Sequence, residues 1–204
     1  SSAIPFTQNI SYSTYGSTYF DGTGDNLTVP NSAFDLTSAI WSIEYWIYPT
    51  TIASTTYYGL WALSTSGFRQ GIYGDSGTHY LSVLNAGGGY GGFNLVAANK
   101  VITLNNWQHI ALTSDGTTIR QFYNGVQTST GSVASFTPST PTIGSWGASS
   151  YFAGYMSNFR IVIGSSTYTA NFTPPTSLLT AVTNTRLLTL QYNGGANNSG
   201  IIDN

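Results

Sequence analysis

The chain has 204 residues, of which 15% are aromatic and 6% are charged, and it contains a single glutamate and no cysteine. Acid-base and nucleophilic catalysis need titratable groups in pairs or triads, so this composition favours binding over reaction chemistry. A formal net charge of −2 argues against nucleic acid as a partner, because that affinity comes mostly from lysine and arginine. No apolar run approaches the ~20 residues of a spanning helix, so we expect no membrane insertion.

The hydrophobic pattern has a period of two and predicts an all-β chain of short strands separated by Gly, Ser, Asn and Pro. In chain order the predicted strands are Tyr19–Phe20, Asn26–Val29, Trp41–Pro49, Leu60–Leu63, Gly71–Tyr73, Tyr80–Leu84, Phe93–Val96, Trp107–Thr113, Ile119–Tyr123, Pro141–Ile143, Met156–Ile163 and Leu187–Gln191. Such spacing indicates a sandwich in a single domain of this length. One short turn is predicted near Pro174–Thr180.

Two segments of this pattern are especially informative. Within Trp41–Pro49 both faces carry aromatic residues, so we expect this strand to be covered on both sides or to line a groove. The dipeptides Asp115-Gly116 and Asn124-Gly125 suit positive φ and bracket the strand Ile119–Tyr123, which predicts consecutive hairpins.

Six motifs in order resemble the laminin G-like, concanavalin A-like lectin/glucanase superfamily. They are YFDGTGDNLTVP at 19–30, WSIEYWIYP at 41–49, NWQHIA at 106–111, YNG at 123–125, TIG at 142–144 and GYMSNFRI at 154–161. The resemblance implies a jelly-roll sandwich of two antiparallel sheets that serves mainly in recognition. We place this domain at residues 1–182, and residues 183–204 form a C-terminal strand or a connector toward a further repeat.

A narrower resemblance lies in the tail. The segment YTANFTPPT at 168–176 is similar to the end of such domains in structural and tail-associated proteins of marine bacteriophages, where they often recur in tandem. This implies a virion or extracellular location, with neighbouring tandem domains or a homo-oligomer as partners.

The superfamily also contains glycosidases, which need two carboxylates. Glu44 has no carboxylate at i+2 or i+4, and the chain has no other glutamate. We therefore predict that the protein is not an enzyme. For Glu44 the favoured role is that of a hydrogen-bonded strand carboxylate that holds a loop or an arginine.

A calcium site is the one cofactor that the pattern suggests. Asp21, Asp25 and Asn26 cluster in a turn that the family often uses near a structural calcium, and calcium prefers such oxygen ligands. Related domains frequently carry an acidic residue where this chain has Ser157, so the serine leaves the calcium site with one charged ligand fewer. The alternative is that Asp21 only forms the turn by capping its own backbone.

Loop aromatics with polar neighbours are the candidates for a sugar site, because a pyranose stacks its apolar face on an aromatic ring. Two loops, 87–92 and 144–152, are rich in small residues and carry isolated large rings. The predicted ligand-binding residues are Tyr57, Tyr58, Asp75, His79, Asn85, Tyr90, Trp146 and Tyr151. We assign Trp41, Trp46, Trp61 and Trp107 mainly to the core or to covered faces.

These observations favour a non-catalytic, lectin-like module that binds a carbohydrate or a cell-surface glycan within a phage or extracellular adhesion protein. The alternative is a structural domain that decorates a virion or joins subunits without sugar. A large apolar self-interface would distinguish the second from the first.

Overall fold

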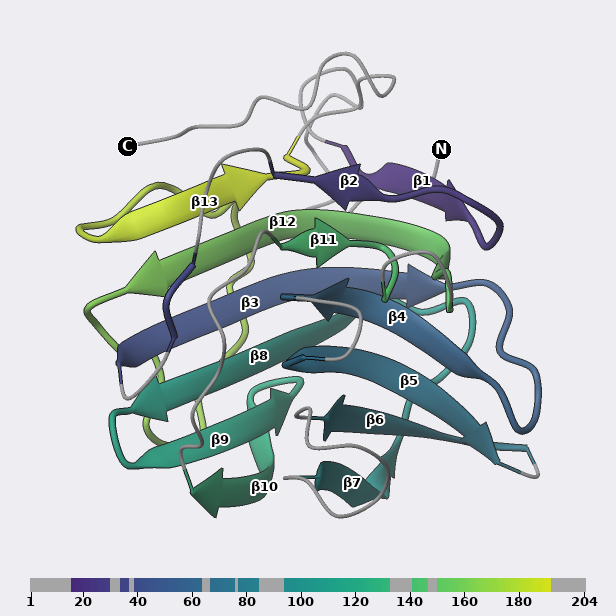
Figure 1. Ribbon diagram of the computed structural model, residues 1–204, viewed down its shortest axis with the longest axis horizontal. Coiled ribbons are helices and arrows are strands. Elements are labelled where there is room, and N and C mark those ends of the chain that lie inside the picture. The colour runs from purple at the N-terminus through teal and green to yellow at the C-terminus, as the bar shows by residue number, and fades with distance from the viewer. Residues whose placement is uncertain are drawn as a thin grey trace.

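The computed structural model describes residues 16–29, 34–36, 39–63, 67–75, 77–84, 94–132, 141–146 and 150–191, with the backbone alone described over 94–101. These residues form two antiparallel sheets stacked face to face, and no helix occurs among them (Figure 1). The predicted jelly-roll sandwich is therefore confirmed.

The larger sheet has seven strands. Its order is β1 (Thr18–Asp21), β12 (Ala153–Ile163), β3 (Ile40–Pro49), β8 (Gln108–Asp115), β9 (Thr118–Tyr123) and β10 (Val126–Ser132), with β13 (Thr185–Thr189) also paired to β12. The sequence pattern did not reveal β10, because Val126 is its single apolar residue and the strand has no alternation to detect. Its partner β9 supplies the pairing instead, so tertiary context decides this element.

The second sheet has six strands. Its order is β2 (Leu27–Thr28), β11 (Thr142–Ile143), β4 (Tyr57–Ala62), β5 (Arg69–Asp75), β6 (Thr78–Leu84) and β7 (Asn94–Val101). Strand β4 begins at Tyr57, three residues before the predicted start, so Tyr57 and Tyr58 belong to a strand and not to a loop.

The two predicted hairpins are confirmed. Asp115 ends β8 and Gly116 follows it in the turn to β9, where the Asp115 carboxylate accepts the backbone N–H groups of Thr117 and Thr118 at 3.0 and 2.8 Å. Asn124 and Gly125 connect β9 to β10 with φ of 48° and 77°. Gly116, Asn124 and Gly125 thus have the positive φ that favours Gly and Asn in hairpin turns. The predicted turn at 174–180 is present only as a bend, at 176–177.

The core between the sheets follows the alternation of β3. Trp41, Ile43, Tyr45 and Ile47 are all fully buried and meet side chains from β4, β5 and β6. One polar connection crosses this core: the Gln70 side-chain oxygen accepts both the Tyr45 hydroxyl at 2.7 Å and the Trp61 indole N–H at 2.9 Å. The Gln70 amide then donates to Gln121 on the seven-stranded sheet at 3.0 Å, so its polar group is satisfied.

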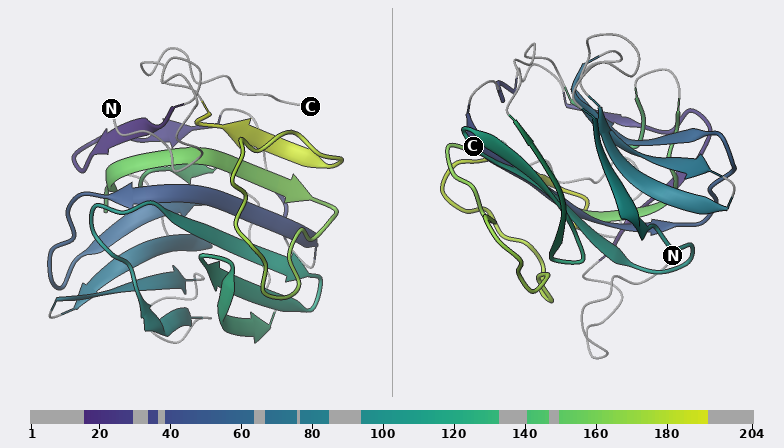
Figure 2. Two further views of the ribbon diagram at one scale, coloured as in Figure 1. Left: turned by 180° about the vertical axis from the view of Figure 1, so that it is seen from behind. Right: turned by 90° about the horizontal axis from the view of Figure 1, so that it is seen from below.

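The outer face of the seven-stranded sheet is also covered, by the segment 164–184 between β12 and β13, which we call the C-terminal strap. It crosses β12, β3 and β8 on the outside of the sandwich (Figure 2). Thr167 N donates to Ser42 Oγ at 2.7 Å, and Phe172 N donates to the Gly125 carbonyl at 2.9 Å. The strap explains why aromatic residues occupy both faces of β3, as the sequence predicted.

Strand β13 pairs with the second half of β12, while β1 pairs with the first half. The two strands therefore lie end to end along β12, and Gly16 N donates to the Gln191 carbonyl at 3.2 Å where they meet. The sheet thus includes residues beyond 182, and residues 192–204 of the predicted connector lie outside the described part.

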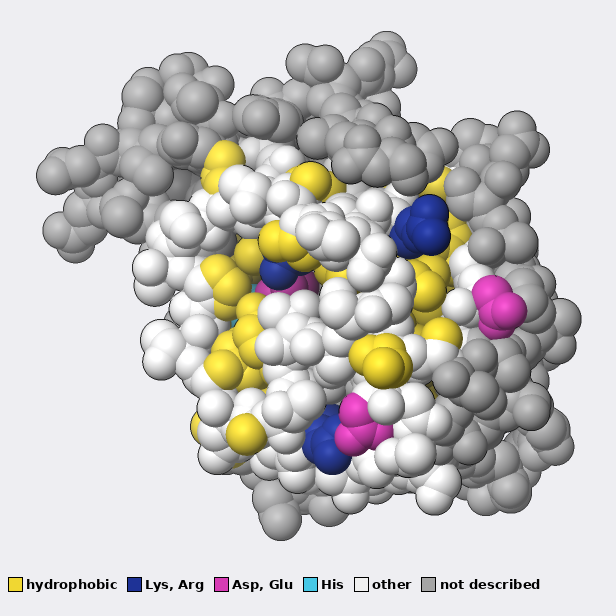
Figure 3. Space-filling view, turned by 90° about the vertical axis from the view of Figure 1, so that its left-hand side faces the viewer, with side chains coloured by type: hydrophobic (Ala, Val, Ile, Leu, Met, Phe, Trp, Pro, Cys, Tyr) yellow, Lys and Arg dark blue, Asp and Glu magenta, His cyan; other side chains and the backbone are white. Residues whose placement is uncertain are grey.

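The surface reflects the scarcity of charge. On the side shown in Figure 3, acidic and basic side chains are sparse among uncharged and apolar ones, and some of them lie side by side as oppositely charged neighbours. In the part of the chain that the structure describes, no helix has the length and hydropathy needed to cross a bilayer.

Candidate functional site

The outer face of the six-stranded sheet carries three tyrosines in register. Tyr57 on β4 pairs with Tyr73 on β5, and Tyr73 pairs with Tyr80 on β6. The rings of Tyr57 and Tyr73 lie 4.5 Å apart, and all three tyrosines are partly exposed. Cross-strand neighbours on one face of a sheet are close enough to form one continuous surface. We call these residues, together with Trp146, the outer aromatic face.

Trp146 lies against this face because two glycines make room for it. A Cβ atom on Gly59 would stand 2.6 Å from Trp146 Cδ1, and one on Gly71 would collide with the same indole. The indole N–H donates to the Gln70 carbonyl at 2.9 Å. The ring is 5.0 Å from that of Tyr57, and the Arg69 guanidinium carbon lies 4.7 Å from its centroid. This is a cation–π arrangement, which holds the indole in place.

The burial of Trp146 changes the role expected for it. Its side chain is only 5% exposed, so it is not an open ring in a mobile loop. It supports Tyr57 and Arg69 from below, whereas Tyr57 and Tyr73 present the accessible rings. Burial also lowers the pKa of Arg69, whose guanidinium nevertheless stays charged at neutral pH.

Other predicted ligand-binding residues are divided between two faces. Asp75 is exposed and lies two residues beyond Tyr73 on the same face. Tyr58 points the opposite way, packs against the core and accepts the Ala53 N–H at 2.9 Å. His79 pairs with Gly74, and its Nδ1 lies 3.2 Å from the Ile102 carbonyl. Tyr58 and His79 therefore do not share the face of Tyr57.

Three predicted residues remain to be placed. Tyr151 is half-buried beside Ser150, whose carbonyl accepts the Gly59 N–H at 2.7 Å, so it is close in sequence to the segment that carries Trp146. Asn85 and Tyr90 lie outside the described residues.

Sequence reasoning missed Tyr73, Tyr80 and Arg69. The signal was present in β5, where Arg69, Gly71, Tyr73 and Asp75 alternate along one face. A glycine within such a strand marks close approach by another group, and here that group is Trp146.

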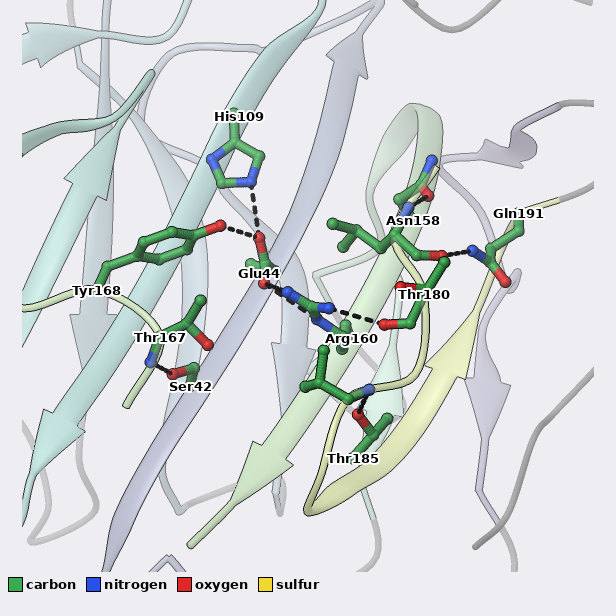
Figure 4. Close-up of polar contacts among 12 residues, drawn as sticks. Ser42, Glu44, His109, Asn158, Arg160, Thr167, Tyr168, Thr180, Thr185 and Gln191 are labelled. Carbon is green, nitrogen blue, oxygen red and sulfur yellow. Dashed lines mark hydrogen bonds and ion pairs between the residues drawn. The ribbon is translucent and has the colours of Figure 1, made fainter. Parts of the chain in front are cut away.

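Glu44 is the centre of a second polar cluster, on the outer face of the seven-stranded sheet beneath the C-terminal strap (Figure 4). Its Oε1 accepts Arg160 Nε at 3.1 Å and Nη2 at 2.5 Å. Its Oε2 accepts the Tyr168 hydroxyl at 2.8 Å and lies 3.3 Å from His109 Nε2. Arg160 Nη1 donates to the Thr180 carbonyl at 2.8 Å, so Glu44 holds the strap directly at Tyr168 and through Arg160 at Thr180.

This geometry confirms the expected role of Glu44 as a strand carboxylate that holds an arginine and a neighbouring segment. Burial raises the pKa of Glu44, but the hydrogen bond from His109 and the charge of Arg160 outweigh it, and the pKa lies below its usual value. Burial and the nearby Glu44 charge raise the pKa of Tyr168. The general acid of a glycosidase needs a raised pKa and a second carboxyl group nearby. The described hydrogen-bond partners of Glu44 include no carboxyl group.

The predicted calcium residues form a compact turn. Asp21 Oδ1 accepts the Thr23 N–H at 2.6 Å, and Asp25 Oδ2 accepts the Asp21 N–H at 3.1 Å. The capping role of Asp21 is therefore confirmed. Within the described residues no three His, Cys, Asp or Glu side chains converge. Asp21 and Asp25 each keep one oxygen not engaged in these bonds, and calcium binding at this turn stays a prediction.

Ser157 does not belong to this turn. Asp21 pairs with Ala153, four residues before Ser157 on β12, which places Ser157 roughly 13 Å along the strand. Its hydroxyl donates to the Gly16 carbonyl at 2.9 Å and is buried. An acidic residue there would not complete the ligand set of Asp21 and Asp25, so the expected loss of a ligand is wrong for this chain.

Comparison with known proteins agrees with this architecture. The family model described as "Concanavalin A-like lectin/glucanases superfamily" matches residues 21–167. No curated protein sequence matches the chain.

Several solved structures share the fold at low sequence identity. A protein from Bacteroides ovatus ATCC 8483 whose carbohydrate binding is inferred has a TM-score of 0.59 and 17% identity, over 85% of this chain and 50% of that one. The botulinum neurotoxin serotype D ligand binding domain in complex with N-acetylneuraminic acid has a TM-score of 0.55 and 13% identity, over 80% of this chain and 42% of that one. Mouse laminin α1 chain domains LG4-5 have a TM-score of 0.51 and 14% identity, over 78% of this chain and 45% of that one. The chain thus spans half or less of each of these structures.

Proposed function

The chain belongs to the concanavalin A-like lectin/glucanases superfamily, and we propose that it is a non-catalytic module that binds a glycan on the outer aromatic face. The observation that carries this proposal is the register of Tyr57, Tyr73 and Tyr80 across three adjacent strands, with Trp146 fixed beside them. Partly exposed rings in a row offer stacking surfaces for the apolar faces of successive sugars.

Polar groups on the same face would fix the orientation of the sugar. The Asp75 carboxylate accepts hydrogen bonds from hydroxyls, and the Arg69 guanidinium donates them. Because two glycines and a buried tryptophan hold the face in position, little ordering entropy is lost on binding. This combination of rigid rings and a few directed polar groups is typical of small-ligand sites.

The similar structures support the proposal at the level of the fold. One of them is described as carbohydrate binding and another is a complex with N-acetylneuraminic acid. Because proteins of one fold can have different functions, the proposal itself depends on the residues of the site. We further propose display on a virion or an extracellular adhesion protein, in line with the tail motif at 168–176. The whole parent protein, its tandem domains and its oligomeric state belong to the same proposal.

The experiment that tests this function is a glycan array probed with the wild-type protein and with Tyr57→Ala and Tyr73→Ala. We expect selective binding that either substitution weakens by about two- to tenfold, the value of one aromatic contact. Tyr73→Phe keeps the ring and serves as the matched control. Absence of any glycan signal, together with a stable self-interface, would favour the structural alternative. Hydrolysis of a β-glucan that disappears in Glu44→Gln would contradict the non-catalytic assignment.

A further inference from the structure

A second row of aromatic side chains lies on the outer face of the opposite, seven-stranded sheet. Tyr19 on β1 pairs with Tyr155 on β12, and Tyr155 pairs with Tyr48 on β3. Trp107, directly before β8, continues the row beside Tyr48. The ring centroids are 5.0, 5.9 and 5.5 Å apart along the row. We call these four residues the back-sheet row.

The back-sheet row is uncovered because the C-terminal strap stops short of it. The next row on the same face contains Ser157, Trp46 and His109, which are at most 9% exposed. Leu178 of the strap and Trp107 both pack against Trp46. The strap crosses the middle of the sheet and leaves the ends of β3 and β12 near this row open (Figure 2).

The side chains of the row are accessible. Tyr19 is 53% exposed, and Tyr48, Trp107 and Tyr155 are partly exposed. A contiguous group of large, partly exposed rings on one sheet face is a candidate binding surface.

We propose that the back-sheet row binds an extended, uncharged glycan chain laid across the strands. Successive rings advance by about one strand spacing, ~4.8 Å, which is close to the rise of one sugar in an extended chain. Neighbouring rings are turned by 48°, 75° and 56°, so a flat aromatic ligand cannot stack on all of them. A chain of sugars joined by rotatable bonds can present a separate face to each ring.

The flanks of the row support an uncharged polar occupant. Asn105 and Asn106 are exposed beside Trp107, and Asp21 is exposed two residues from Tyr19 on the same face. Amide and carboxylate groups at the two ends can bond sugar hydroxyls, while Asp21 disfavours an anionic chain. A second copy of the protein is a poorer fit, because a stable interface buries ~1,000 Å² or more whereas the row is one residue wide along each strand.

This inference rests on the proposed carbohydrate binding and adds a second surface to it. The outer aromatic face and the back-sheet row belong to different sheets, on opposite sides of the sandwich. A module with both surfaces would hold two glycan chains, or two parts of one, and gain avidity without further contacts.

The test uses neutral β-linked hexasaccharides and trisaccharides of glucose, xylose and mannose, titrated by calorimetry. Measurements are made in a background with Tyr57→Ala, Tyr73→Ala and Tyr80→Ala, which removes all three tyrosine rings of the outer aromatic face. We expect at least one hexasaccharide to bind more tightly than its trisaccharide. Adding Tyr155→Ala or Tyr48→Ala should weaken binding about two- to tenfold per ring, whereas Tyr155→Phe should retain it. Thermal melts of each variant verify that it is folded.

The outcomes separate this inference from the proposed function. If the wild type binds glycans through Tyr57 and Tyr73 but Tyr155→Ala and Tyr48→Ala change nothing, the proposed function stands and the back-sheet row is not a glycan site. If light scattering shows a dimer that Tyr155→Ala dissociates, the row is a protein interface and the inference is wrong. A preference for sulfated or carboxylated chains would refute the uncharged class. Failure of the wild type to bind any glycan would overturn both proposals.

Discussion

Replacing Glu44 by Gln is expected to destabilise the protein strongly although it alters the side-chain volume very little. Glu44 is 1% exposed and Arg160 is 6% exposed, so neither charge is solvated by water. In Glu44→Gln the Arg160 guanidinium keeps its charge but loses the carboxylate that it contacts through Nε and Nη2. The hydrogen bond that Tyr168 makes to Glu44 from the C-terminal strap is weakened at the same time.

The expected magnitude follows from the burial of the pair. Removing one partner of a buried ion pair costs about 3–5 kcal/mol, because the other charge is left uncompensated. The glutamine oxygen can still accept one hydrogen bond from Arg160, so we expect a loss near the lower end, about 3 kcal/mol. Domains have a total unfolding free energy of about 5–15 kcal/mol, so this change is large enough to be measured easily.

The assay is urea denaturation followed by tryptophan fluorescence at neutral pH. The control is Arg120→Gln, which removes a more exposed ion pair, with Asp115, and should shift the midpoint far less. The double variant Glu44→Gln with Arg160→Met should recover part of the loss, because no buried charge remains. A midpoint for Glu44→Gln equal to that of the wild type, or a loss no larger than that of Arg120→Gln, would refute the reasoning.

Three further predictions concern pH, packing and calcium. The folded-state pKa of Glu44 is below its usual value, so its contribution to the unfolding free energy is complete above the unfolded-state pKa and is lost as pH falls through the folded-state pKa. The urea midpoint of the wild type should therefore fall in acid more steeply than that of Glu44→Gln. Equal slopes of midpoint against pH would contradict this. Gly71→Ala would place a methyl group in the Trp146 indole, so we expect a loss of about 1–3 kcal/mol and weaker glycan binding; unchanged melting and binding would rule out the glycine explanation. If Asp21 helps to bind calcium, millimolar calcium should raise the melting temperature of the wild type but not of Asp21→Asn, and a flat response in both would remove the calcium prediction.

The strands could be predicted from the sequence because local alternation and turn residues carry most of that information. Trp41–Pro49 alternates in the way that a strand with one face in the core requires, and Asn124-Gly125 has a conformational preference that few other dipeptides share. Strand β10 could not be predicted in this way, since its residues are polar and its pairing with β9 depends on the preceding turn.

The candidate site was harder to predict because its parts meet only in the folded chain. Tyr57 and Tyr58 are adjacent in sequence, yet one faces outward and the other packs against the core, which depends on the strand register. The position of Trp146 depends on Gly59 and Gly71, which are 87 and 75 residues earlier in the numbering of the chain. A glycine within a strand marks a close approach, but it does not indicate which distant residue approaches or that two such glycines leave space for the same indole.

The distribution of the few charges connects the fold to its proposed role. The single glutamate is held by Arg160 and His109 beneath the C-terminal strap, where it is inaccessible and cannot act on a substrate. By attaching the strap to the middle of the seven-stranded sheet, this cluster covers Trp46 and leaves Tyr48 and Tyr155 open. The same network that excludes Glu44 from catalysis therefore determines which aromatic rings on that sheet are available for binding.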